Sequence, residues 1–282
     1  MGHQEYEGYE CLSIRVERGV CFATFDHPPI NLLDLPMMQE IDRLGRELET
    51  DDQVRVVVFD SADPDFFIAH ADVSLIQQLP DNLPQRSEEL SFFHVMVDRF
   101  RTMPKVSIAK IEGRARGGGS EFVLSLDMRF AALGKAVFAQ PEVALGILPG
   151  GSGTQRLPRL CGRGRALEVI LGCQDFSAEV AERYGYVNRA LPSDEIDGFV
   201  KKLAFKIASF PPQAIALAKG CVNSAEVGVI DGLLDEAHAF NQTLPIPETR
   251  RRMAEFLANG GQTRELESAD LGMLADMLAA KK

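Results

Sequence analysis

Short apolar runs alternate with segments of helical periodicity through the first half of the chain. Val54–Asp60 and Val106–Ile111 are rich in β-branched residues, as in parallel strands that are buried on both faces. Before them, Leu35–Glu49 and Ser87–Thr102 carry apolar residues at helical spacing. Strands that alternate with helices form βαβ units with right-handed crossovers. The pattern therefore predicts an α/β core built on parallel strands.

The rest of the sequence divides into this core, expected over residues 10–195, and a helical C-terminal region over residues 196–282. The core is expected to contain a hairpin of Cys11–Glu17 and Val20–Asp26, strands at Met128–Leu133 and Ala136–Phe138, and a helix at Glu121–Leu126. The segment Phe66–Asp72, after a turn at Ala62–Pro64, has no assigned secondary structure. From Arg163 onward one strand is expected, Val187–Ala190. The helices expected there are Arg165–Leu171, Ala178–Tyr184, Glu195–Ser209, Pro212–Asn223, Ile230–Thr243, Pro245–Leu257 and Leu271–Ala280.

Composition restricts the partners of the chain. The net charge of -11 argues against a nucleic-acid partner, because neutralising phosphates requires a basic face. No run of 18 apolar residues is present, which argues against a membrane span. The five cysteines are scattered without a CxxC pair, so we expect reduced thiols in a cytoplasmic protein and no zinc site or disulfide framework.

A glycine-rich segment, Gly113–Gly119, follows a predicted strand and leads into a predicted helix. Its three consecutive glycines suggest a tight turn or the close approach of a ligand to the backbone. Unpaired N–H groups at a helix N-terminus can bind an anion or a developing oxyanion. Glu121 lies in the first turn of this helix. Taken by itself, Glu121 also fits a residue that only complements the helix dipole.

A second segment, Ala139–Glu142, is followed by Pro149-Gly150-Gly151. Glu142 stands directly after a Gln-Pro pair. A glutamate in such a turn is commonly just solvated, so Glu142 alone is weak evidence for chemistry. Considered together, the two segments indicate a protein family.

Four stretches in fixed order resemble the enoyl-CoA hydratase/isomerase (crotonase) superfamily. They are FIAHADV from Phe67, EGRARGGGSEF from Glu112, FAQPEVALGILPGGSGTQRL from Phe138 and GRALEVILG from Gly164. The resemblance covers about Val20 to Leu257. It implies the crotonase α/β fold, with repeated ββα units in two near-perpendicular sheets and a C-terminal helical trimerisation region. It also implies a homotrimer or a dimer of trimers, in which the apolar helix at Leu271–Ala280 packs within its own chain or against a neighbour.

The resemblance assigns roles to individual residues. Two backbone N–H groups form the family's oxyanion hole, here those of Ala71 and Gly118, and the hydratases carry two acid–base glutamates, here Glu121 and Glu142. Gly150 matches the glycine whose N–H helps to seat the water. The residues assigned to positioning of water or substrate are Gly117, Gly150, Asp72 and His70.

These residues fit the addition of water to a trans-2-enoyl-CoA thioester. The thioester oxygen gains negative charge, which a backbone donor stabilises by about 3–4 kcal/mol. One carboxylate takes a proton from water and a protonated partner supplies the C2 proton. The reaction needs no metal or redox cofactor, since coenzyme A enters with the substrate. The alternatives are an enoyl-CoA isomerase or another crotonase-type reaction, and an acyl-CoA-binding protein with little turnover.

Two positions depart from the family pattern. His70 replaces a common glycine, and its side chain either points at the acyl pocket or, as we favour, packs under the loop. Arg250–Arg252 replaces an acidic-glycine pair near the C-terminus. This run either contacts the coenzyme A phosphates or forms a solvated helix face.

Overall fold

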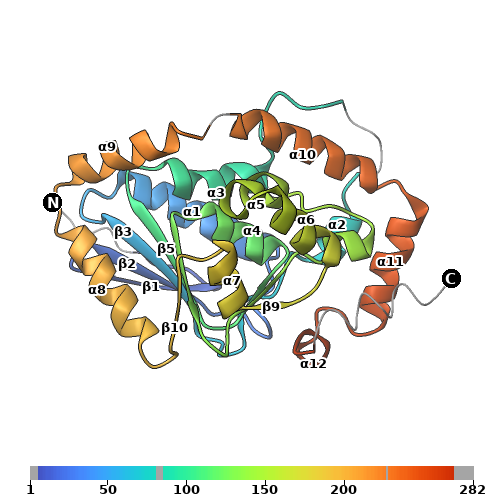
Figure 1. Cartoon of the computed structure of the whole chain (residues 1–282), viewed down its shortest axis with the longest axis horizontal. Coiled ribbons are helices and arrows are strands. Elements are labelled where there is room, and N and C mark those ends of the chain that lie inside the picture. The colour runs from blue at the N-terminus through green and yellow to red at the C-terminus, as the bar shows by residue number, and fades with distance from the viewer. Residues whose placement is uncertain (1–5, 81–84, 227, 270–282) are drawn as a thin grey trace.

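The computed structural model describes residues 6–80, 85–226 and 228–269 and contains two sheets (Figure 1). The six-stranded sheet has the order β1-β2-β3-β5-β7-β10, with β1 and β2 antiparallel and the remaining neighbours parallel. Its strands are β1 (Leu12–Glu17), β2 (Val20–Phe25), β3 (Val56–Ser61), β5 (Val106–Ile111), β7 (Met128–Ala132) and β10 (Arg189–Leu191). The four-stranded sheet has the order β4-β6-β8-β9 and consists of β4 (Phe66–Ile68), β6 (Arg114–Arg116), β8 (Val137–Ala139) and β9 (Phe176–Ser177).

From β3 to β8, successive strands alternate between the two sheets. β3, β5 and β7 lie in the large sheet, and each is followed by a short strand of the small sheet and then by helix. This alternation gives the repeated ββα units expected from the sequence. The helices of this part are α1 (Leu35–Thr50), α2 (Val73–Gln77), α3 (Phe92–Thr102), α4 (Gly118–Ser125), the 3-10 helix η1 (Glu142–Leu145), α5 (Gly153–Cys161), α6 (Arg163–Gly172) and α7 (Ala178–Tyr184).

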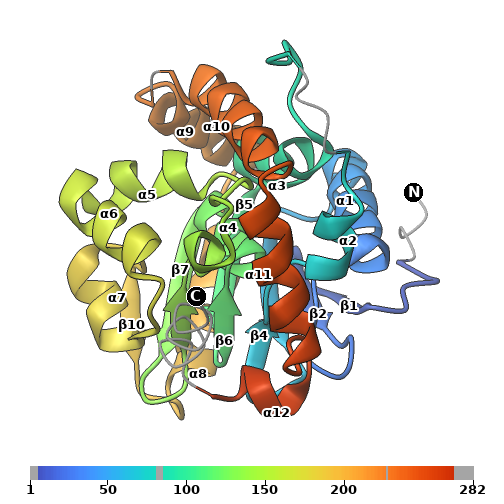
Figure 2. The same ribbon diagram turned by 90° about the vertical axis from the view of Figure 1, so that its right-hand side faces the viewer.

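After β10 the described chain is helical. α8 packs its apolar face on the large sheet, and α9 to α11 then arch over the core to the far end of the molecule (Figures 1 and 2). The elements are α8 (Ile196–Ala208), α9 (Pro212–Asn223), α10 (Val229–Thr243), α11 (Pro247–Ala258) and α12 (Arg264–Glu267). Within the described residues no helix has the length and apolar character that crossing a membrane requires.

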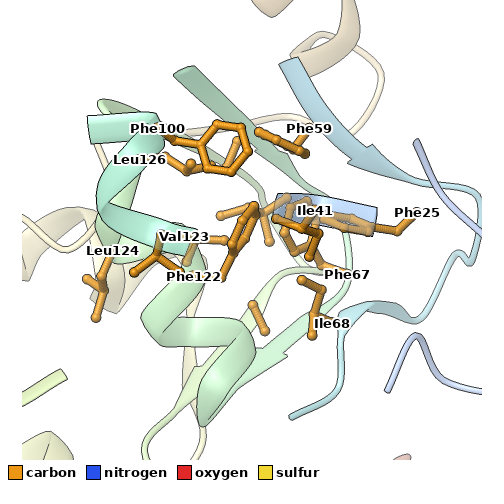
Figure 3. Close-up of a cluster of buried hydrophobic side chains, with 14 of the residues drawn as sticks. Phe25, Ile41, Phe59, Phe67, Ile68, Phe100, Phe122, Val123, Leu124 and Leu126 are labelled. Atoms are coloured by element: carbon orange, nitrogen blue, oxygen red, sulfur yellow. The ribbon is translucent and has the colours of Figure 1, made fainter. Parts of the chain in front are cut away.

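A cluster of phenylalanine rings fixes α4 between the sheet and its covering helices (Figure 3). The Phe122 ring lies edge-to-face against Phe59 at 5.1 Å and against Phe25 at 5.8 Å between centroids. Complete burial of such a side chain contributes about 1.5–3 kcal/mol. Because Phe122 follows Glu121 directly, this packing sets the rotation of α4 and therefore the direction of the Glu121 side chain.

Most expected elements are present, and several differences have clear physical causes. The unassigned segment Phe66–Asp72 forms β4 up to Ile68, and its Asp72 side chain accepts the Ser74 N–H and caps α2. The helix expected from Ser87 begins at Phe92, where Ser91 provides the cap. The elements that were not predicted are β4, α2, β6, η1, α5, β9 and α12. The helix predicted at Leu271–Ala280 lies outside the described residues.

Candidate active site

Ala71 and Gly118, the two predicted oxyanion-hole residues, lie side by side. A Cβ atom placed on Gly118 would be 3.3 Å from Ala71 N and 2.9 Å from Ala71 Cβ, so a glycine is needed for this approach. Ala71 follows β4 and forms a parallel bridge with Leu33 that leaves its own N–H unused. Gly118 N–H is at the start of α4, where helical N–H groups lack an intrahelical partner. Within the described chain, neither N–H donates to a protein acceptor.

Gly117 makes the turn that leads into α4. Its φ of 48° and ψ of -126° are sterically costly for a side-chain-bearing residue. Its N–H donates to Ala139 O at 3.0 Å, which ties the turn to β8. A Cβ on Gly117 would stand 3.0 Å from Glu142 Oε1 and 3.4 Å from His70 Cβ. Gly117 therefore lies between the second glutamate and the histidine.

Glu121 is buried in the first turn of α4, as predicted. Its Oε1 accepts hydrogen bonds from the N–H groups of Gly151 and Gly153, both at 2.8 Å. Burial raises the pKa of Glu121 well above its ordinary value, and the charges of Glu142 and Glu236 raise it further. The two N–H donors oppose that rise because they stabilise the carboxylate. Oε2 is left without a backbone donor among the described residues.

Glu142 begins η1 directly after Pro141 and is also buried. Burial raises its pKa to about 8, although the nearby charge of His70 lowers it. The Gln140 side-chain amide stands between Glu142 and Ser120, 3.0 and 3.1 Å from the carboxyl oxygens and 2.9 Å from Ser120 Oγ. With its nitrogen toward Glu142, the amide donates to an ionised carboxylate. With its oxygen there, it accepts from a protonated carboxyl, so Gln140 can serve both charge states.

The two glutamates and the two N–H groups open onto one cavity of about 450 Å³. This volume is in the range of small-molecule sites, which are typically about 300–1,000 Å³. Its walls are mainly apolar. Side chains that form them include Leu33, Met38, Leu75, Ile76, Phe93 and Phe240. An apolar wall that excludes water strengthens hydrogen bonds to a developing charge.

A smaller cavity of about 50 Å³ is also lined by Ala71 and Gly118. Glu142 lines both cavities, whereas His70, Cys173 and Phe256 line only this one. The His70 ring is buried and does not line the larger cavity, in agreement with the favoured alternative that it packs under its loop, and it makes two polar contacts there. Its Nδ1 is 2.8 Å from Ala71 O, and its Nε2 is 3.0 Å from Glu267 Oε1.

Asp72 and Gly150, the remaining predicted positioning residues, lie at the wall of the larger cavity. The Asp72 carboxylate is engaged as the cap of α2 and also accepts from Gln262 Nε2 at 3.0 Å. Gly150 faces the Phe240 ring so closely that a Cβ would be 2.6 Å from Phe240 Cδ2. The positioning roles given to these two residues stay predictions.

Glu236 is a buried carboxylate near the site that the sequence did not reveal. It comes from α10, accepts N–H groups from Ser152 and Thr154, and accepts from His94 Nε2 at 3.2 Å. His94 and Glu236 are both completely buried. In the sequence, His94 is an isolated histidine and Glu236 one of many glutamates on amphipathic helices. No local pattern distinguishes them.

The arginine run of α11 is largely engaged in intrachain pairs. Arg251 forms ion pairs with Glu248 and Glu255, both at 2.6 Å, and Arg252 pairs with Glu248 at 2.8 Å. Intrachain pairs of this kind occur on a solvated helix face, and contact of the run with the coenzyme A phosphates stays a prediction. Over the described part of the chain, no three His, Cys, Asp or Glu side chains gather in a way that could hold a metal ion.

Two buried carboxyls and a pair of backbone N–H groups line one cavity on the ββα units, which is the arrangement expected of the crotonase class. A profile of the enoyl-CoA hydratase/isomerase family matches residues 15–257, and the chain belongs to that family. The short-chain-enoyl-CoA hydratase of Clostridium acetobutylicum is 34% identical over 86% of this chain and 92% of its own. The crotonyl-CoA hydratase of Syntrophomonas wolfei is 32% identical over 88% of this chain and 95% of its own.

Solved structures agree on the fold. The crystal structure of a putative enoyl-CoA hydratase from Streptomyces avermitilis has a TM-score of 0.89 and 38% identity, and the match covers 97% of this chain and all of that one. The fold is therefore the crotonase fold expected from the sequence.

Proposed function

We propose that this chain is an enoyl-CoA hydratase that adds water reversibly across the double bond of a trans-2-enoyl-CoA thioester. The observation that carries the proposal is that Glu121 and Glu142 line the same apolar cavity as Ala71 and Gly118. An oxyanion hole alone would serve many reactions of thioesters. Two carboxyls in addition supply the separate proton acceptor and proton donor that a hydration requires.

The hydrogen bonds of the two glutamates favour one division of roles. Glu121 is the base, because two backbone N–H groups stabilise its ionised form. Burial raises the pKa of both carboxyls, and Glu142, which lacks the pair of Gly151 and Gly153 donors, is the one that holds a proton while Glu121 is ionised. Glu142 is therefore assigned as the acid. Which residue is acid and which is base could not be assigned from the sequence.

In the proposed reaction Glu121 accepts one proton and Glu142 donates one. Water attacks C3 as Glu121 takes one of its protons, and the π electrons move toward the thioester oxygen, where the N–H groups of Ala71 and Gly118 stabilise the enolate. The Glu142 carboxyl gives its proton to C2 and completes the 3-hydroxyacyl-CoA. Each N–H donor contributes about 3–4 kcal/mol to the stability of the transition state. The next cycle begins after Glu121 loses its proton and Glu142 regains one. No step needs a metal or a redox cofactor.

The test is the loss of enone absorbance when the protein is mixed with crotonyl-CoA. We expect rapid loss with the native protein and a fall in kcat of at least about 10³-fold in both Glu121→Gln and Glu142→Gln. An isomerase would need mainly one of the two acids and would convert a 3-enoyl-CoA instead. An acyl-CoA-binding protein would bind crotonyl-CoA without turnover and without exchange of solvent deuterium at C2. Either result would reject the hydratase assignment.

We also infer a homotrimer or a dimer of trimers in the cytoplasm. Support for assembly comes from α9, where Leu217 and Val222 are each 71% exposed in the single chain. Support for the compartment comes from the five cysteines, all free thiols. Light scattering coupled to size exclusion would test the assembly, and a monomer at micromolar concentration would contradict it.

A further inference from the structure

A C-terminal segment beyond the family match, residues 260–269, is docked on the loop that carries the oxyanion residue Ala71. The Gln262 side chain accepts the Val73 N–H at 2.8 Å and donates to Asp72 at 3.0 Å. Glu267, which is 1% exposed, bonds His70. Three positions of the oxyanion loop, His70, Asp72 and Val73, are therefore held by this segment.

The contacts of His70 determine its charge. Nδ1 faces the carbonyl oxygen of Ala71, and Nε2 faces a carboxylate oxygen of Glu267. A carbonyl accepts hydrogen bonds and does not donate, and the same is true of an ionised carboxylate. Both ring nitrogens must then carry protons, so the side chain is an imidazolium.

The surroundings of Glu267 keep it ionised. Its Oε1 also accepts the Gln262 N–H at 2.9 Å, and Arg116 stands 3.8 Å from Oε2. Burial by itself would raise the pKa of Glu267, but the charge and hydrogen bond of His70, the Gln262 N–H and Arg116 outweigh it and lower that pKa. In the same way, burial would lower the pKa of His70, but Glu267 and the Ala71 carbonyl raise it, against the opposing charge of Arg116.

The His70 imidazolium lies beside both the Ala71 peptide of the proposed oxyanion hole and Glu142. His70 precedes Ala71, and the Leu33 N–H donates to His70 O at 2.9 Å, so the peptide that carries the Ala71 N–H is anchored on one side. The His70 ring anchors the next peptide through Ala71 O. Across Gly117, the same ring shares the small cavity with Glu142 and Cys173. The charged groups that face His70 are Glu267 on α12, Arg116 on β6 and Glu142 on η1, while α11 contributes the Phe256 ring at 5.8 Å.

We propose that His70 is a positioning residue, an imidazolium held by Glu267 that fixes the Ala71 peptide of the oxyanion hole and places a positive charge beside Glu142. The C-terminal segment thereby becomes part of the catalytic apparatus. The inference rests on the proposed hydratase function for its kinetic test but not for its spectroscopic test.

The kinetic test compares His70→Gln with His27→Gln. His27 forms a similar pair with Asp34 at 2.8 Å, but it lines neither cavity, so it controls for loss of a histidine–carboxylate pair. For His70→Gln we expect kcat on crotonyl-CoA to fall about 10-fold. KM should stay within about 3-fold of the native value, because the substitution removes no contact with the bound substrate. The alkaline limb of kcat/KM should move up by about half a pH unit or more, because the cation that lowers the Glu142 pKa is gone.

Glu267→Gln should move the limb in the same direction, and the double variant should shift it no further than His70→Gln alone. His27→Gln should leave both the limb and kcat in place. An unmoved limb in His70→Gln, or equal shifts in His70→Gln and His27→Gln, would overturn the proposal.

The spectroscopic test uses the native protein and does not depend on turnover. Nitrogen-15 NMR of labelled histidine should show protons on both ring nitrogens of His70 between pH 6 and pH 8. A neutral His70 ring at pH 7 would refute the charge assignment even if the protein is a hydratase. A protein inactive on crotonyl-CoA with a charged His70 would refute the proposed function but leave the pair intact.

Discussion

Glu121 and Glu236 divide four consecutive backbone N–H groups between them. Those of Gly151 and Gly153 donate to Glu121 Oε1, both at 2.8 Å. Those of Ser152 and Thr154 donate to Glu236, at 2.5 and 2.8 Å. Because the donors alternate along one loop, the position of Glu121, the proposed base, depends on a carboxylate from α10 that lies outside the α/β core.

Replacing Glu236 by glutamine should therefore impair a site that it does not touch. The amide NH₂ that takes the place of one carboxylate oxygen would face backbone donors, and an unpaired buried donor costs about 1–3 kcal/mol. We expect kcat to fall about 10- to 100-fold with little change in KM, because the loop that orients Glu121 loosens. Steady-state hydration of crotonyl-CoA measures this effect.

Asp235→Asn is the matched control for that experiment. Asp235 is the neighbouring acid on α10, and its side chain is 67% exposed in a pair with Arg86. A surface pair of this kind contributes about 0–1 kcal/mol, so kcat should not change. If Asp235→Asn and Glu236→Gln lost activity equally, the loop argument would fail.

The pH profile of the native enzyme should have an upper limb near pH 8. Glu142 must be protonated to supply the C2 proton, and its pKa is about 8, so kcat/KM should decline as the pH rises through that value. Glu121 and Glu142 lie in one site and titrate as a pair, so the limb is a property of both carboxyls. A profile flat from pH 7 to pH 10 under saturating and limiting substrate would contradict the acid role of Glu142.

Adding one methyl group at Gly118 should disrupt the proposed oxyanion hole. The new Cβ in Gly118→Ala would be 2.9 Å from Ala71 Cβ, closer than real Cβ contacts allow, so the two N–H groups must separate. Loss of such a donor typically costs about 10²–10³-fold in kcat. At Gly164 in α6, a Cβ would have no heavy atom within 4 Å, so Gly164→Ala should keep full activity. Equal activity in the two variants would exclude the Ala71–Gly118 pair as the oxyanion hole.

Part of this site was predictable because its residues lie in contiguous sequence motifs. Gly117, Gly118 and Glu121 occupy one stretch of chain, and their spacing on a helix start fixes their relative positions. Glu236 and His94 are 142 residues apart and meet only when α10 folds back over α3. The local sequence around a single residue on an amphipathic helix does not indicate such a long-range contact.

The missed elements have related explanations. α2 and α12 are one-turn helices, which are too short to show a period of 3.6 residues. α5 contains Pro158, a residue that usually ends a helix, and it follows Ser152 in the left-handed region with a φ of 103°. β9 has two residues and pairs with β8, so it exists only through that neighbour. His70 was expected to pack under its loop because an isolated histidine is usually structural. Its pairing with Glu267 was not expected, because Glu267 lies beyond the stretch that resembles the family.

Replacing the ionisable Glu142 by glutamine should stabilise the protein at alkaline pH while it inactivates the enzyme. The pKa of Glu142 is about 8 in the folded state against 4.5 for an ordinary glutamate, so the folded state holds a proton that the unfolded chain has lost between these values. Folding stability therefore falls as the pH rises from about 4.5 to 8. Glu142→Gln keeps the shape of the neutral acid and has no such dependence. We expect the difference in Tm between Glu142→Gln and the native protein to be small at pH 5 and to grow in favour of the variant up to pH 9, as followed by calorimetry. Glu248→Gln is the control, because its exposed side chain pairs within α11 and should give no gain at pH 9. A variant that is less stable than the native protein at pH 9 would show that Glu142 is ionised and favourably paired in the folded state, and would remove the basis for its role as the acid.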